Sequence, residues 1–186
     1  MASPSISDRP ERPASARPPA ADAFALLGLT PAFDVDVAAL EKAFFERSKE
    51  VHPDRFASAP AAERVVALSR SRALNDAYQV LKKPISRAEY LLAQAGVTIG
   101  DNERLDPAAL MPILEERELL ADAIGAKHLA EVGRLQAAMQ ATRARELERV
   151  RDGFARGDLA VVKHALILLR YVERYLEACD AALDEE

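Results

Sequence analysis

The stretch SKEVHPDRFASAPAAERV, residues 48–65, joins two long segments that both show helical periodicity. His52, Pro53 and Asp54 stand at the end of the first segment. Proline disfavours helical geometry at the residue before it, so the first helix must end by His52. A loop of small residues follows to about residue 61, before the second helix. The stretch predicts two antiparallel helices with His-Pro-Asp at their turn.

Helical patterns fill the chain from Asp22 onward, and no segment alternates as a strand would. Asp22 can cap a short helix that ends near Gly28, and Asp34 or Asp36 can cap the helix before His-Pro-Asp. Further helices are expected over about 62–83, 84–96, 107–124, 127–156 and 158–183. The polar stretch 97–106 lacks periodicity. It divides the chain into a helical-hairpin module, residues 22–96, and a three-helix bundle, residues 107–186.

Composition narrows the class of protein. The formal net charge is −5, which disfavours a general nucleic-acid binder. The apolar run 165–169 is too short to cross a bilayer. Residues 1–21 are rich in proline and lack the apolar stretch of a signal peptide, so they are interpreted as a disordered tail. We expect a soluble, cytoplasmic protein.

Catalytic and metal-binding chemistry is not expected. The single cysteine, Cys179, cannot form a disulfide or a cysteine zinc site within one chain, and is interpreted as a small apolar residue of a helix. His52, His128 and His164 fall on different elements without metal-ligand spacing. The sequence therefore favours a binding protein that needs no cofactor over an enzyme.

The helix before His-Pro-Asp has two faces. On a helical wheel, Leu40, Phe44 and Val51 cluster on a core face. An outward face carries Lys42, Phe45 and Lys49 and leads into His52. Exposed lysines alone are typical of a solvated helix. Because this face ends at His-Pro-Asp, it is interpreted as a binding surface.

The helix that begins near Pro107 carries a second unusual face. Glu115, Glu118 and Asp122 lie within about 40° of Met111, roughly opposite a core face formed by Ile113, Leu120 and Ile124. Leu114 borders the acidic residues, and Leu110 lies further round. These apolar residues beside an acidic stripe could form a partner-binding site. Alternatively, Leu110 and Met111 pack into the contact between the two modules.

Three motifs, in order, resemble the HscB-type J-domain co-chaperones of iron–sulfur cluster assembly. They are HPDRFA (52–57), RAEYLL (87–92) and LMPILEEREL (110–119), and the resemblance covers about residues 22–183. The chain departs from the family at Val51, where an aromatic residue is frequent, and in its proline-rich tail. It also lacks the tetracysteine zinc module of some eukaryotic relatives.

The resemblance implies an all-α fold: a J-domain over 22–96, a linker over 97–106 and a scaffold-binding three-helix bundle over 107–186, in an L shape. It implies a co-chaperone that stimulates the ATPase of a seventy-kilodalton heat-shock chaperone of the HscA type and delivers an IscU-type cluster scaffold to it. The implied chaperone-binding residues are Lys42, Lys49, His52, Pro53, Asp54 and Arg55. The implied scaffold-binding residues are Leu110, Met111, Leu114, Glu115, Glu118, Asp122 and Tyr171.

Two other readings compete with this function. A generic J-domain protein with a different client would share His-Pro-Asp, but the stretch 110–119 argues against it. A helical DNA-binding protein would need a basic recognition helix, and residues 70–83 are the one candidate. That segment places most of one face in the expected core, which disfavours DNA binding.

Overall fold

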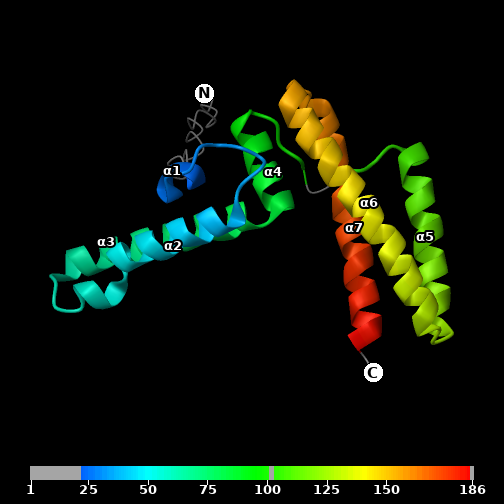
Figure 1. Cartoon of the computed structure of the whole chain (residues 1–186), viewed down its shortest axis with the longest axis horizontal. Helices are drawn as coiled ribbons and strands as arrows, with labels where there is room; N and C mark the ends of the chain where they lie inside the picture. The colour runs from blue at the N-terminus through cyan, green and yellow to red at the C-terminus, as the bar shows by residue number, and fades with distance from the viewer. Residues whose placement is uncertain (1–21, 101–102, 185–186) are drawn as a thin grey trace, which may run out of the picture.

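The fold is all-α over the described residues, 22–100 and 103–184 of a computed structural model, which confirms the predicted fold class. The predicted tail over 1–21 lies outside the described residues. Two helical arms meet at an angle (Figure 1). The elements are α1 (Ala23–Leu27), α2 (Val37–Val51), the 3-10 helix η1 (Pro53–Phe56), α3 (Ala61–Lys82), α4 (Pro84–Gln94), α5 (Pro107–Gly125), α6 (Leu129–Arg156) and α7 (Leu159–Asp184).

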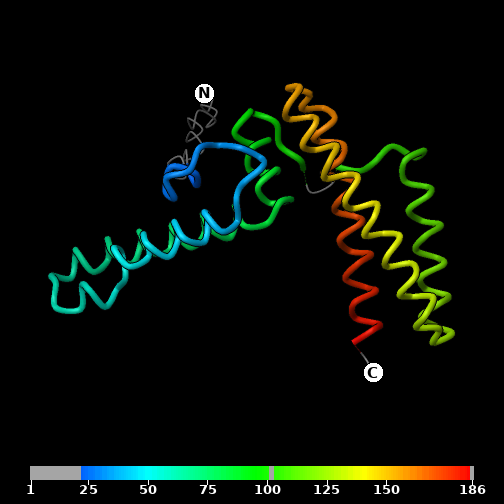
Figure 2. Tube along the Cα trace, viewed as in Figure 1, coloured from blue at the N-terminus to red at the C-terminus, as the bar shows by residue number. Residues whose placement is uncertain are grey.

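The first arm is the predicted helical hairpin, in which α2 and α3 run side by side (Figure 2). Asp36 starts α2 by accepting hydrogen bonds from the backbone N–H groups of Ala38 and Ala39 at 2.9 and 3.3 Å. The rings of Phe44 and Tyr78 stack across the pair with centroids 4.2 Å apart. Buried residues of α1, α2 and α3 complete the core, namely Ala23, Phe24, Leu27, Leu40, Leu74, Ala77 and Leu81.

The second arm consists of α5, α6 and α7, and α4 connects it to the first. Ala88 and Leu92 of α4 are fully buried in a cluster with Val150 of α6 and with Leu166 and Leu169 of α7. The two modules therefore share one hydrophobic cluster instead of being joined by a free tether. Burial of this apolar surface fixes α4 against the α6–α7 pair.

The stretch 97–106 differs from the polar spacer that its composition predicts. Val97 and Ile99 pack against the cluster around Leu92, and Leu105 is buried in a second cluster with Ile113 and Ile167. The stretch has few apolar residues, but Val97, Ile99 and Leu105 each pack against neighbouring helices. The described part of the connection is consequently held on the second arm.

Ion pairs flank the shared cluster. The Arg151 guanidinium donates to both carboxylate oxygens of Asp34, at 2.9 and 3.0 Å. Arg170 of α7 pairs with Glu89 of α4 at 3.0 Å. Pairs as exposed as these contribute little to stability, so they mainly select one orientation of the buried contact.

Neither a membrane-spanning helix nor a cluster of metal-binding side chains is found among the described residues. No helix there is long and apolar enough to cross a membrane. Nor does that part of the chain gather three or more His, Cys, Asp or Glu side chains that could hold a metal ion.

Leu92→Ala should destabilise the whole protein. Leu92 is fully buried where the arms meet, so its truncation leaves a cavity and should lower the free energy of unfolding by about 2–5 kcal/mol. Leu68→Ala is the matched control, because Leu68 is exposed on α3 and its truncation should change that free energy by less than about 0.5 kcal/mol. Chemical denaturation measures both. If Leu92→Ala changed the free energy of unfolding as little as Leu68→Ala does, the shared cluster would not hold the arms together.

Candidate partner-binding sites

The His-Pro-Asp turn is exposed at the tip of the first arm. His52 ends α2 and begins η1, and its Nδ1 accepts a hydrogen bond from the backbone N–H of Asp54 at 3.3 Å. The Asp54 carboxylate lies 3.6 Å from the same nitrogen, which is too long for a hydrogen bond. The backbone contact therefore places the proton of neutral His52 on Nε2. The side chains of His52 and Asp54 are 57% and 91% exposed, so both can meet a partner.

Arg55 ties this turn to the end of α2. Its guanidinium donates to the carbonyl oxygen of Lys49 at 3.2 Å, and its backbone N–H donates to the carbonyl oxygen of His52 at 3.0 Å. A cation that satisfies a carbonyl at a helix C-terminus stabilises that end. Pro53 occupies the first turn of η1, where its fixed φ suits the helix. The turn is therefore preorganised, and the loop expected there contains a short helix.

A basic and aromatic face leads from α2 to this turn. Lys49 lies over the ring of Phe45, with Nζ 4.0 Å from the centroid, and the Phe45 side chain is 61% exposed. Lys42 is also exposed, two turns earlier on the same face. The structure thus brings Phe45, Lys49 and the His-Pro-Asp turn together at one end of the arm.

The second candidate site lies on α5, whose first turn is fixed by Asp106. One Asp106 oxygen accepts a hydrogen bond from the Ala109 backbone N–H at 3.0 Å. That bond is the main reason why the pKa of Asp106 falls below its usual value, and the nearby His164 lowers it further. Pro107 begins the helix, and Pro112 within it has no N–H to donate. The start of α5 therefore depends on its cap.

The outward face of α5 carries most of the predicted scaffold-binding residues. Met111 and Leu114 are 54% and 41% exposed, large fractions for apolar side chains. The acidic residues that surround them, Glu115, Glu118 and Asp122, are exposed as well. The alternative that Met111 packs into the contact between the two modules is therefore wrong. Leu119, beside Glu115, is a further exposed apolar residue that the sequence analysis did not include in this face. Its position on the helical wheel could have identified it.

Leu110 and Tyr171 lie at the edge of this face. Both are partly buried against the cluster of Leu105, Ile113 and Ile167. They can support the exposed face and touch a partner with their open sides. Ile124, expected in the core with Leu120, is instead 37% exposed because α5 turns it toward the groove beside α7.

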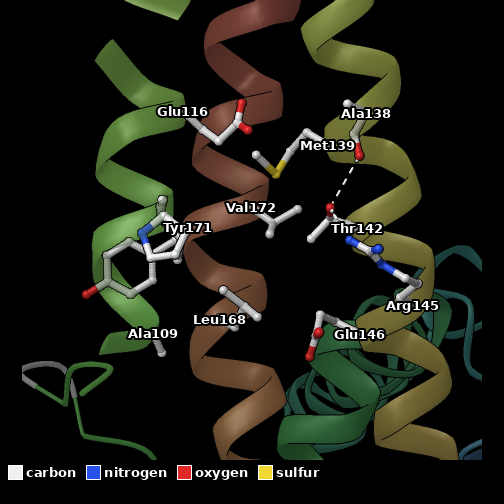
Figure 3. Close-up of a pocket in the computed structure, with 12 residues that line it drawn as sticks. Ala109, Glu116, Ala138, Met139, Thr142, Arg145, Glu146, Leu168, Tyr171 and Val172 are labelled. Atoms are coloured by element: carbon white, nitrogen blue, oxygen red, sulfur yellow. Dashed lines mark hydrogen bonds between the residues drawn. The ribbon is translucent and has the colours of Figure 1, made fainter. Parts of the chain in front are cut away.

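A cavity of about 320 Å³ separates the inner side of α5 from α6 and α7 (Figure 3). Its apolar wall includes Ile113, Met139 and Val172. On α6, Thr142 donates to the Ala138 carbonyl, and buried Glu146 pairs with Arg149 at 2.9 Å. These polar groups of α6 are therefore satisfied within the helix, while Glu116 and Tyr171 line the side of the cavity formed by α5 and α7.

Both arms match known families. The family model described as DnaJ domain matches residues 22–90, and the one described as HSCB C-terminal oligomerisation domain matches residues 105–180. A co-chaperone protein HscB homolog of Bordetella petrii is 41% identical over 143 residues, which cover 73% of this chain and 84% of the relative.

A second relative and a solved structure are also similar to this chain, over different fractions of its length. A homolog of the same name from Pseudoalteromonas atlantica is 47% identical over 102 residues, 54% of this chain and 58% of that relative. The crystal structure of the human co-chaperone protein HscB is 27% identical, with a TM-score of 0.81 over 97% of this chain and 93% of the human one. The chain belongs to the HscB family of J-domain co-chaperones.

Proposed function

We propose that this chain stimulates the ATPase of a seventy-kilodalton heat-shock chaperone of the HscA type and delivers an iron–sulfur cluster scaffold of the IscU type to it. The observation that carries the proposal is the presence of two exposed faces on one framework, whose arms share a buried cluster. The His-Pro-Asp turn lies at the tip of one arm, and the apolar and acidic face of α5 lies on the other.

The chaperone would bind along α2 and the turn after it. Lys42 and Lys49 would steer an acidic surface toward the arm, because exposed charges act mainly on association and orientation. His52, Pro53, Asp54 and Arg55 would then form the contact at the tip. Such a contact catalyses nothing itself, but it can favour one conformational state of the chaperone if it binds that state more tightly.

The scaffold would bind on α5. Met111 and Leu114 would form the apolar anchor, since interface energy concentrates in a few central residues. Glu115, Glu118 and Asp122 would orient the scaffold through their charge. Leu110 and Tyr171 would border the anchor from the side of α7. We expect these events to take place in the cytoplasm, without a cofactor and without nucleic acid or membrane.

A J-domain protein with another client is the competing function. It shares the chaperone-binding tip, so only the α5 face separates the two proposals. Direct binding of purified IscU-type scaffold to this chain is the observation that decides between them.

His52→Gln should abolish stimulation of the chaperone ATPase. The side chain is exposed, so the change should alter the free energy of unfolding by less than about 0.5 kcal/mol. His128→Gln is the matched control, because His128 is exposed on the other arm. Steady-state ATP hydrolysis with the cognate chaperone measures the effect. Full stimulation by the His52 variant would reduce the tripeptide to a helix stop.

A double Met111→Ala, Leu114→Ala variant should bind the scaffold more weakly by at least about 2 kcal/mol, since it removes the apolar anchor. Calorimetric titration with purified scaffold measures this loss. Val65→Ala with Leu68→Ala is the matched control, because these exposed residues of α3 lie on the other arm. If the α5 variant bound the scaffold with wild-type affinity, the scaffold site would lie elsewhere on the chain. A folded wild-type chain that binds no scaffold would favour a different client.

A further inference from the structure

A second groove lies beside the proposed scaffold face, between α5 and α7. It has a volume of about 180 Å³, and its lining includes Arg117, Ala121 and Ile124 of α5 and Tyr171, Arg174 and Ala178 of α7. These six residues are called the arginine groove below. Tyr171 belongs both to this groove and to the edge of the proposed scaffold face. The two surfaces are therefore continuous.

The arginines of this groove differ from most of their neighbours on α6 and α7. Arg143, Arg149 and Arg170 each pair with a carboxylate at 3.0 Å or less. Arg117 and Arg174 are exposed, and neither has a carboxylate within ion-pair distance among the described residues. The chain carries a formal net charge of −5, so acidic side chains are plentiful elsewhere on it. Two cations thus remain available at facing positions of one groove.

The sign of the charge changes around α5. Leu114 lies about 60° round the helix from Arg117 on one side and about 40° from Glu118 on the other. An apolar strip that includes Leu114 and Ala121 therefore separates an acidic flank from a basic one. A partner that covers the strip must meet negative charge along one edge and positive charge along the other. Such a pattern fixes orientation, because the reversed pose places like charges together.

We propose that the arginine groove binds an acidic segment of the scaffold protein, with Arg174 and Arg117 as its counter-charges. This inference rests on the proposed scaffold-binding function and extends its site from α5 onto α7. The apolar lining, which includes Ile124, Tyr171 and Ala178, accepts the apolar part of the segment, and the arginines meet its carboxylates. Acidic chemistry is chosen because two unpaired guanidinium groups face the same space.

The test compares two doubly neutralised variants of the full chain. Arg117→Gln with Arg174→Gln removes the groove charges. Arg72→Gln with Arg145→Gln removes two charges from exposed arginines of α3 and α6 that have no carboxylate partner among the described residues, so the net charge of the two variants is equal. Stopped-flow association with purified IscU-type scaffold is measured from low to high salt. Thermal unfolding checks that both variants keep their fold.

The groove variant should associate about 10-fold more slowly than the wild type at low salt, because rim charges steer association. The difference should vanish near 1 M salt, where the screening length is about 3 Å. The control variant should associate like the wild type. Full-speed association of the groove variant, with binding still weakened in the Met111 and Leu114 variant, would overturn the inference and leave the proposed function intact.

Two further results would also overturn it. If the wild-type chain binds no scaffold at all, the proposed function falls and the inference falls with it. If the wild type self-associates in sedimentation, while the groove variant is monomeric and binds scaffold at the normal rate, the groove holds the acidic face of a second copy.

Discussion

Burial of α4 against α6 and α7 is the contact on which the rest of the structure depends. Ala88 and Leu92 enter a cluster whose other members come mainly from the second arm. Two short helical modules joined by an open tether would rotate freely, since interfaces between domains are usually small. Here the apolar residues of the connection, Val97 and Ile99, add to the same cluster. The result is one framework that presents the proposed chaperone-binding tip and the proposed scaffold-binding face in a single relative orientation.

That framework gives the proposed function a physical basis. A co-chaperone must bring a client to a chaperone while it changes the chaperone's conformational equilibrium. The exposed groups on each arm are suited to recognition. The His52 turn is preorganised by local hydrogen bonds, and the α5 face combines apolar anchors with charge. A fixed angle between them lowers the entropy lost when both partners are held at once.

Local patterns in the sequence were enough to predict the helices and the exposure of most candidate site residues. Pro53 predicts the end of α2 because its effect on the backbone needs no tertiary context. Of the two candidate caps, Asp34 and Asp36, it is Asp36 that begins the helix. Helical periodicity likewise placed Met111 and Glu118 on an outward face. Packing between distant segments was not predictable in this way. Leu105 is buried although its local stretch is polar, and Ile124 is exposed although it shares a stripe with Leu120. In both cases the neighbouring helix, and not the local pattern, decides burial.

The central claim is that α4 locks the two arms into one rigid body. Residual dipolar couplings of the backbone amides, measured on the full chain in a weakly aligning medium, test it most directly. The account predicts that a single alignment tensor fits the couplings of α2 and α3 together with those of α6 and α7. Tensors of clearly different magnitude for the two arms would show independent motion and would contradict the account.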